Sequence, residues 1–320
     1  MIAILAFDHG RTIQTDHVEP AWLEEGATVR FWVDVTSPTD EDGRLLSELF
    51  HFHPLSVEDA LSTIQFPKVE QYDDYLYMVL HGIDFRKKQH HFATLDVDFF
   101  LGRNYLVTVH TGESRSVKRI TELCARRENV LAEGPVALLH RIVDAMVDNY
   151  RPEIDALEAR ISKLEEQAFT GRDNIVKSLL QLKRDLSSLR RVVIPQRDAI
   201  GRLARREFGS ISEEMTYRFR DVYDHLVRIS DEATIFQDRV NGILEAHLSA
   251  VSNRLNEVMK VLTVMSTIFL PLTVLTGMWG MNIRLPYMPG GEAAQFWWIG
   301  AMMAAVVVVM LAYFKRRNWL

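Results

Sequence analysis

Two long uninterrupted apolar runs lie near the C-terminal end of this 320-residue chain. Residues 261–283 and 293–314 contain no Asp, Glu, Lys or Arg, whereas charged residues are spread through the preceding sequence. Each run has about 22 residues, enough to cross a bilayer about 30 Å thick as a helix. The pattern predicts transmembrane helices over 258–281 and 294–314, joined by a loop over 282–293.

The first part of the chain alternates between strand-like and helix-like patterns. Residues 1–112 contain short runs rich in β-branched and aromatic residues, separated by amphipathic segments. This predicts an α/β domain with a mixed or mostly antiparallel sheet. Strands are expected over 28–35, 75–85 and 95–110, the last a hairpin that turns at 102–104, and helices over 40–50 and 56–61.

The remaining polar part is helical in pattern. Residues 113–211 are expected to form a helical hairpin, with apolar residues spaced by three and four along 138–169 and again along 174–200. From 212 to 270 there is no proline and Gly242 is the only glycine. A stalk helix is therefore predicted over 212–257, running directly into the first membrane helix over a total of roughly 90 Å at 1.5 Å per residue.

Charge predicts the topology in the membrane. The tail after the second run, 315–320, carries Lys315, Arg316 and Arg317, whereas the connector carries Arg284 and Glu292. Because positive loops remain inside, both termini are expected in the cytoplasm and the connector outside. The single cysteine, Cys124, is expected to be a buried thiol in a reducing compartment.

A row of small and polar residues follows the first membrane helix. We name it the polar stripe: Asn256, Met259, Thr263, Ser266, Leu270, Thr273 and Gly277. Its spacing of three and four is that of a supercoiled seam. The stripe fits either close helix packing in lipid or the lining of a channel, and a channel needs a symmetric ring of several chains. Its neutral oxygens would bind the water shell of an ion, with Met259 and Leu270 as apolar constrictions.

The residues that end this helix carry a family resemblance. Gly280, Met281 and Asn282 form a GMN motif within the longer stretch 256–282, which resembles the CorA family of magnesium and cobalt channels. Further matching blocks occur in the same order along the soluble part. They are WVDV at 32–35, HPLSVEDA at 53–60, FPKVEQYDDYLYMVL at 66–80, VDAMVDNY at 143–150 and RFRDVYDH at 218–225.

This resemblance implies a funnel-shaped homopentamer in the inner membrane. Each chain would contribute an α/β cytoplasmic domain, a long stalk helix and two C-terminal transmembrane helices. The pore residues implied are Asn256, Met259, Leu262, Leu270, Thr273, Gly280, Met281 and Asn282. At one turn the family match names Leu262 where the polar stripe names Thr263.

The resemblance also implies a divalent-ion sensor between neighbouring subunits. The matching carboxylates are Asp59 and Asp221, with Glu58, Asp144, Asp148 and His225 nearby. Facing carboxylates repel one another until a divalent ion neutralises them, so ion binding would hold a closed ring together. The implied function is passive influx of hydrated Mg2+ that Mg2+ itself gates, with Co2+ and Ni2+ as further cargo.

Two other functions remain open at this point. The connector has Met288, Pro289, Gly290 and Gly291 where the family commonly has MPEL, a departure that is similar to the zinc-transporting branch, so Zn2+ is an alternative cargo. A membrane-anchored scaffold that transports nothing is the second alternative. No enzyme is expected, because the sequence has no Gly-rich phosphate loop, nucleophile elbow or HExxH motif. The expected partners are lipid, hydrated cations and copies of the chain, without nucleic acid.

Overall fold

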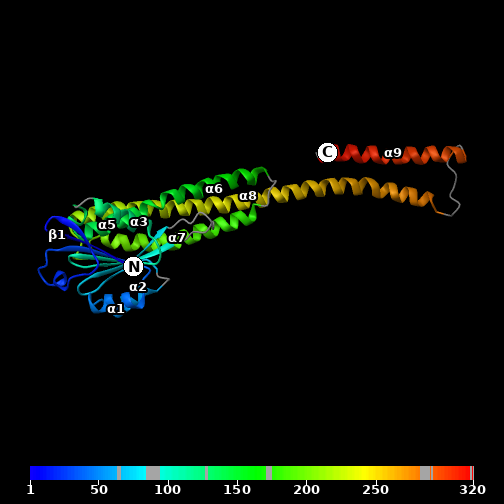
Figure 1. Cartoon of the computed structure of the whole chain (residues 1–320). Helices are drawn as coiled ribbons and strands as arrows, with labels where there is room; N and C mark the ends of the chain where they lie inside the picture. Colours follow the sequence, from blue (N-terminus) through cyan, green and yellow to red (C-terminus); the bar gives the residue numbers. More distant parts are fainter. Residues whose placement is uncertain are drawn as a thin grey trace. The chain divides into compact units, whose positions relative to one another are not determined.

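A computed structural model describes residues 1–62, 66–83, 94–126, 129–170, 175–281, 289, 291–317 and 319. The chain divides into two compact units. The N-terminal unit comprises Met1–Gln167 and Asn174–Ile243, and the C-terminal unit comprises Ala168–Asp173 and Leu244–Leu320. Figure 1 shows the elements of each.

The N-terminal unit is built on one sheet. Within the described residues it has seven strands in the order β2-β1-β3-β7-β6-β5-β4, and only β3 and β7 pair in parallel. The mostly antiparallel α/β class is thereby confirmed, as is the hairpin at 102–104 between the last two strands. The strands are β1 Ile2–Asp8, β2 Arg11–Thr15, β3 Arg30–Thr36, β4 Lys68–Gln71, β5 Leu76–Ile83, β6 Thr94–Leu101 and β7 Tyr105–His110.

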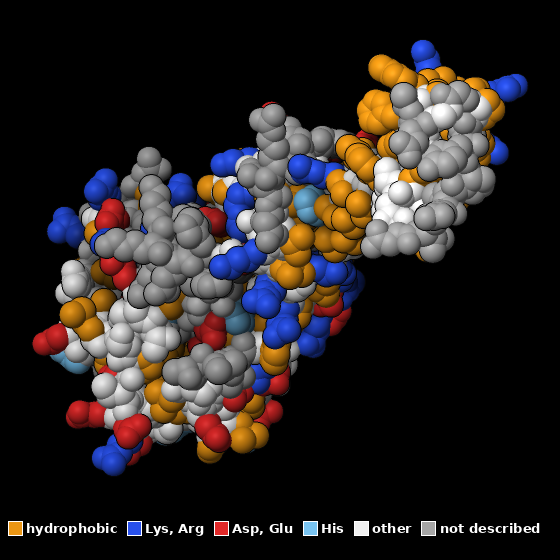
Figure 2. Space-filling model, turned by 90° about the vertical axis from the view of Figure 1, so that its right-hand side faces the viewer, with side chains coloured by type: hydrophobic (Ala, Val, Ile, Leu, Met, Phe, Trp, Pro, Cys, Tyr) orange, Lys and Arg blue, Asp and Glu red, His pale blue; other side chains and the backbone are white. Residues whose placement is uncertain are grey.

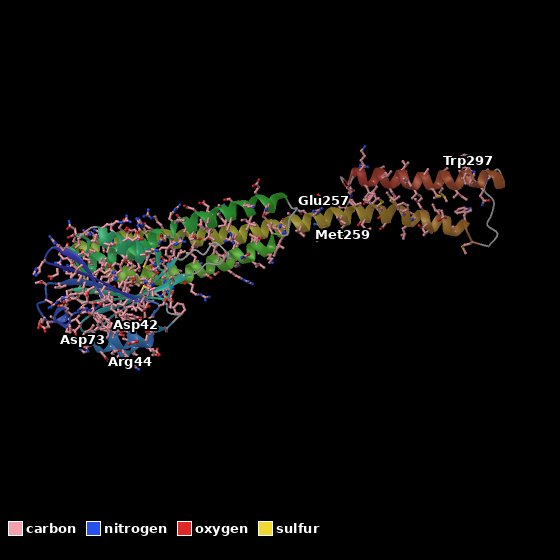
Figure 3. The ribbon with its side chains drawn as sticks, in the orientation of Figure 1. Asp42, Arg44, Asp73, Glu257, Met259 and Trp297 are labelled. Carbon is pink, nitrogen blue, oxygen red and sulfur yellow. The ribbon has the colours of Figure 1, made fainter. Side chains whose placement is uncertain are left out.

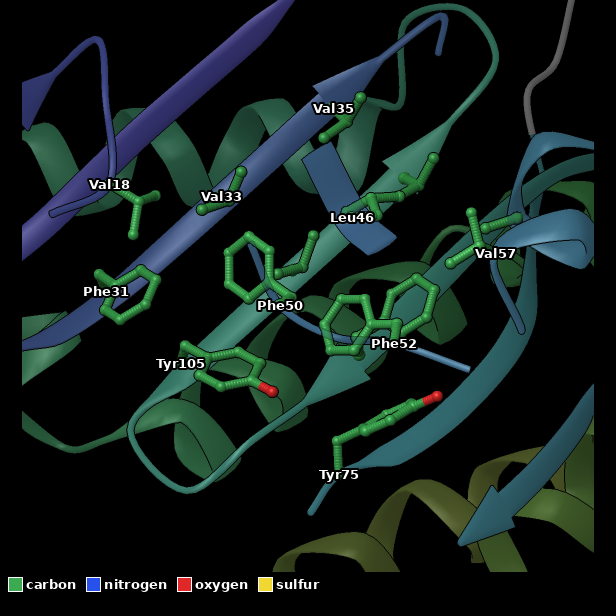
Figure 4. Close-up of a cluster of buried hydrophobic side chains, with 14 of the residues drawn as sticks. Val18, Phe31, Val33, Val35, Leu46, Phe50, Phe52, Val57, Tyr75 and Tyr105 are labelled. Atoms are coloured by element: carbon green, nitrogen blue, oxygen red, sulfur yellow. The ribbon is translucent and has the colours of Figure 1, made fainter. Parts of the chain in front are cut away.

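One face of the sheet is covered by α1 (Asp40–Glu48) and α2 (Pro54–Leu61). A capping box between Thr39 and Asp42 begins α1, and Pro54 at the first turn of α2 loses no hydrogen bond there. The core under these helices is largely aromatic, and Phe52 stacks on Phe100 with ring centroids 4.2 Å apart. Figure 4 shows this cluster between the helices and the sheet.

The opposite face of the sheet is covered by α5 (Pro135–Asp148) and α7 (Val176–Ala204). Side chains alternate along a strand, so Tyr77 and Val79 of β5 face the aromatic cluster while Gly82 faces the other side. A Cβ atom on Gly82 would lie 3.7 Å from the Met146 side chain of α5. Two further helices, α3 (Arg115–Arg126) and α4 (Asn129–Ala132), pack beside α5. Cys124 of α3 is buried, as expected, and burial raises the pKa of its thiol to about 12.

The first arm predicted for the helical hairpin, 138–169, is not a single helix. The segment is broken at Asn149 and Tyr150 into α5 and a separate helix α6 (Arg151–Thr170). Pro152 has no backbone N–H, and its ring would clash with the carbonyl four residues earlier, so α5 cannot continue through it and a new helix starts with the proline in its first turn. The Tyr150 carbonyl accepts hydrogen bonds from Glu153 and Ile154 and so begins α6.

The long helix is α8 (Glu213–Trp279), 67 residues in one element. Its start is capped by Ser212, whose hydroxyl accepts a hydrogen bond from the backbone of Met215. Within the N-terminal unit one side of α8 is buried at steps of three and four residues, and this side includes Phe219, Val222 and Leu226. This portion is therefore a packed amphipathic helix, not an isolated rod.

The C-terminal unit contains the end of α8 and α9 (Glu292–Arg316). Both helices are long and apolar enough to cross a membrane, with mean hydropathy of 1.9 and 2.1 in their most apolar windows, and almost no side chain in these windows is buried by the chain itself. Hydrophobic side chains are exposed over this unit in Figure 2. Trp297, labelled in Figure 3, is one of them.

Candidate ion pathway and sensor

The membrane portion of α8 has two different sides. The more buried side includes Val264, Ile268, Pro271 and Leu275, of which Val264 is 8% exposed. The polar stripe lies roughly 150° away around the helix, at ~100° per residue. All of its residues are exposed in the single chain, and Leu270 reaches 71%. The chain therefore covers one side of this helix and leaves the polar stripe open.

The threonine hydroxyls on this helix are oriented by the backbone. Thr273 Oγ1 donates a hydrogen bond of 2.9 Å to the Phe269 carbonyl one turn earlier. Since its proton is used, the oxygen presents lone pairs outward and can accept a hydrogen bond. The outer hydrogens of a hydrated cation are donors, so such an oxygen suits a water shell.

The structure places the expected pore residues in two groups. Asn256, Met259, Leu262, Leu270 and Thr273 are all exposed on α8, and Met259 is labelled in Figure 3. Leu262 lies on the same open side as Thr263, so both remain candidates at that turn.

Gly280 and Met281 follow the end of α8. The Gly280 N–H bonds to the Thr276 carbonyl at 2.9 Å, and a Cβ atom there would approach that oxygen to 3.1 Å. Glycine therefore permits this tight helix end. Asn282, with the connector over 282–288 and Gly290, lies outside the described residues.

Four of the expected sensor residues share one surface of the N-terminal unit. Asp144 and Asp148 lie on α5, and Asp221 and His225 lie on α8. Burial raises the pKa of Asp144, and the negative charges of Asp148 and Asp221 add to this, while His140 and His225 oppose it. The carboxylates therefore repel one another in the absence of a cation.

Asp59 lies on α2, and its carboxylate is paired with a lysine. Lys68 Nζ is 2.6 Å from Asp59 Oδ2 and 3.2 Å from Glu70 Oε2, and it lies 5.3 Å from the centroid of the Tyr77 ring. Partial burial lowers the pKa of Lys68, but the hydrogen bonds to Asp59 and Glu70 outweigh it, so the net shift is upward. Glu58, the preceding residue on α2, is exposed.

A buried acid lies close to this pair. Asp98 of β6 is 4% exposed and accepts a hydrogen bond from the Tyr77 hydroxyl. Burial raises the pKa of Asp98 to about 7 against the lowering effect of Tyr77, and the charges of Asp96 and Asp59 contribute to the rise. The Asp59 side of the sheet therefore carries several acids and one nearby ammonium.

Within one chain the sheet separates the two groups of sensor residues. Asp59 is on α2 on the aromatic face, whereas Asp144 and Asp148 are on α5 on the opposite face (Figure 1). Among the described residues no cluster of three or more His, Cys, Asp or Glu side chains could hold a metal ion.

Sequence reasoning did not single out Lys68, Glu70 or His140. A sequence signal existed for the first two, since residues two apart on a strand share a face. His140 precedes Asp144 by four residues on α5, and its Nε2 lies 3.2 Å from the Arg218 carbonyl of α8. Burial lowers the pKa of His140, so it is mainly neutral near pH 7.

Comparison with known proteins identifies the family. Residues 29–316 match the family described as CorA-like Mg2+ transporter protein. The cobalt/magnesium transport protein CorA of Thermotoga maritima is 34% identical over 317 residues, which cover 97% of this chain and 89% of that protein. The chain belongs to the CorA family.

Solved structures extend this result to the fold. The CorA magnesium transporter of Methanocaldococcus jannaschii matches 100% of this chain and 99% of its own, with a TM-score of 0.85 at 22% identity. The cytoplasmic domain of ZntB from Vibrio parahaemolyticus covers 78% of this chain and 98% of its own, with a TM-score of 0.63 at 16% identity. This CorA chain therefore has the full fold of its family, and its two apolar helices, together with its CorA relatives, indicate a membrane protein.

Proposed function

We propose that this protein is a passive divalent-cation channel that carries hydrated Mg2+ across the membrane as a homopentamer. The observation that carries the proposal is the polar stripe on the side of α8 that a single chain leaves open. Repeated around a symmetry axis, that side would form a ring of hydroxyl and amide oxygens. The T. maritima relative is a cobalt/magnesium transport protein, which supports Mg2+ with Co2+ as a second cargo.

The chemistry of the stripe favours an ion that keeps its water. Mg2+ releases its water shell reluctantly, and neutral oxygens such as Thr273 Oγ1 offer hydrogen-bond acceptors, not charged ligands. Leu270 and Met259 would form apolar rings that exclude water when the helices are close together. Asn282 would form the outermost ring, with Gly280 and Met281 shaping the turn before it.

Gating would use the carboxylates that one chain keeps apart. Asp59 of one subunit would face Asp221 of the next, with Glu58, Asp144 and Asp148 contributing charge. Burial is the main cause of the raised pKa of Asp144, and the negative charges of Asp148 and Asp221 add a repulsion that a divalent ion would relieve. Mg2+ at this interface would stabilise the closed ring, and loss of Mg2+ would free the subunits to move.

The orientation follows from the basic tail. Lys315, Arg316 and Arg317 after α9 favour a cytoplasmic C-terminus, and two crossings return the N-terminal unit to the same side. In a cell with an inner membrane the protein would reside there, and the negative inside potential would drive uptake of a dication. No step requires an enzymatic activity.

Zn2+ is the second candidate cargo. The connector departs from the common family pattern at 288–291, and the ZntB cytoplasmic domain shares the fold. Ni2+ is a further test ion. Uptake of Mg2+, Co2+, Ni2+ and Zn2+ into one preparation of proteoliposomes distinguishes these cargoes: the proposal expects Mg2+ flux that Zn2+ does not outcompete. Flux equal to that of empty vesicles for every ion would instead support a scaffold that transports nothing.

The sensor is tested separately by proteolysis of the full-length protein. In the wild type, Mg2+ is expected to protect the N-terminal unit from protease. The variant Asp59→Ala with Asp221→Ala should need much more Mg2+ for the same protection. Unchanged protection would remove these two residues from the sensor and leave the channel proposal intact.

A further inference from the structure

The ammonium of Lys68 occupies the position where a sensor cation would approach Asp59. Its Nζ lies 2.6 Å from Asp59 Oδ2, and the side chains of both residues are slightly more than one quarter exposed. The contact joins α2 to the edge strand β4, nine residues further along the chain. The Asp59 carboxylate is therefore neutralised within its own chain before any ion arrives.

A second acceptor for the ammonium is already in place. Glu70 lies two residues after Lys68 on the same face of β4, and its Oε2 is 3.2 Å from Nζ. The Tyr77 ring below gives the ammonium a favourable cation–π contact that does not depend on Asp59. Lys68 can thus remain paired with Glu70 if its bond to Asp59 is broken.

We propose that Lys68 is a tethered cation that competes with the divalent ion for Asp59, and that Glu70 holds the ammonium once the ion has bound. The inference rests on the proposed sensor function of Asp59. The Mg2+ affinity of the sensor then depends on the difference between two free energies, that of the Asp59–Mg2+ contact and that of the Asp59–Lys68 ion pair. It does not depend on the Mg2+ contact alone. Lys68 sets the Mg2+ concentration at which the channel closes.

Two substitutions should shift the sensor in opposite directions. Lys68→Met keeps most of the unbranched side chain but removes the competing charge, so half-maximal protection should need roughly three- to tenfold less Mg2+, as expected for one charge in a partly solvated site. Glu70→Gln removes the alternative partner of the ammonium, so the midpoint should move to higher Mg2+, by roughly two- to fivefold. Lys68→Arg keeps the charge and should stay near the wild-type midpoint.

The experiment is Mg2+ titration of protease protection on the full-length protein. Lys118→Gln is the matched control, because it removes one positive charge from another ion pair of the same unit, that with Glu113. Its midpoint should not move. Repeating the titrations at about 0.15 and 0.5 M NaCl distinguishes a direct Lys68–Asp59 ion pair from a long-range electrostatic effect of the Lys68 charge. At the higher salt the Debye length is about 4 Å, so the long-range effect is screened.

The outcomes are distinct. If Lys68→Met leaves the midpoint unchanged, or if its shift vanishes at high salt, the competition is refuted. If Lys68→Met does not yield folded protein, the direction of the Glu70→Gln shift decides, and a lower or unchanged midpoint overturns the inference. If the wild type itself shows no protection by Mg2+, the sensor proposal fails. That result differs from one in which the wild type is protected and Lys68→Met has the same Mg2+ midpoint.

Discussion

Replacing Asp98 by Asn should remove most of the pH dependence of stability around β5 and β6. Asp98 is a buried residue of β6, and the hydroxyl of Tyr77 on β5 donates to its carboxylate at 2.5 Å. Burial raises the pKa of Asp98 to about 7 from an ordinary value of 3.8. Asn keeps the acceptor for Tyr77 but cannot ionise, so the variant separates the charge from the hydrogen bond.

The sign and size follow from the two pKa values. The folded pKa lies above the unfolded one, so the fold favours the protonated acid, and stability falls as pH rises from about 4 through about 7. The rise of the Asp98 pKa from 3.8 to about 7 corresponds to about 4 kcal/mol in total, of which about 3 kcal/mol is lost between about pH 5 and pH 8.

Hydrogen exchange of the β5 and β6 amides measures this loss directly. After correction for intrinsic exchange, the wild-type opening free energy should fall by about 2–3 kcal/mol between the two pH values, and that of Asp98→Asn should fall by much less. Tyr77→Phe is a useful control, since removing the donor raises the pKa of Asp98 further and should move the fall to higher pH. Equal pH dependence in the wild type and Asp98→Asn would show that ionisation of Asp98 does not cause the loss of stability.

Three further predictions concern other parts of the chain. Asp144→Asn should raise the melting temperature of Mg2+-free protein by about 1–3 °C, because it removes a half-buried charge that Asp148 and Asp221 repel; an unchanged or lower value would contradict this. Arg160→Ala should destabilise the N-terminal unit by about 2 kcal/mol in denaturant titration, since it leaves Asp185, 7% exposed, without its 2.8 Å partner, and a loss within error of zero would count against it. Leu270→Asn should raise Mg2+ flux severalfold under closing concentrations of Mg2+, by wetting an apolar constriction; flux equal to wild type would argue against a gate at that residue.

Periodicity made the architecture accessible from the sequence. Apolar runs without charge predicted the two C-terminal helices, and the absence of proline between 212 and 270 predicted that the stalk and the first of them are one element, as α8 is. Alternation with β-branched residues predicted the hairpin of β6 and β7. In each case the signal is local and repeats over several turns or residues, so no tertiary contact was needed to interpret it.

Features of the structure that depend on tertiary contacts could not be predicted from the sequence. Apolar spacing continued through Pro152, and the break before α6 depends on a backbone constraint that periodicity does not register. The Lys68 pairing joins a helix to a strand, and the sheet that separates Asp59 from Asp144 exists only after folding. The role of the polar stripe depends on chains beyond this one, so its residues stay predictions until flux is measured.

We propose that the open side of α8 lines a path for Mg2+ that ends at Asn282. The most direct measurement is Mg2+ influx into proteoliposomes containing an Mg2+-sensitive dye, under an inside-negative potential, for the wild type and Asn282→Ala reconstituted at equal density. We expect saturable influx in the wild type and a loss of at least about tenfold in Asn282→Ala, which has lost its ring of amide oxygens at the mouth. Equal influx in the two proteins, or wild-type influx no greater than that of empty vesicles, would contradict this proposal.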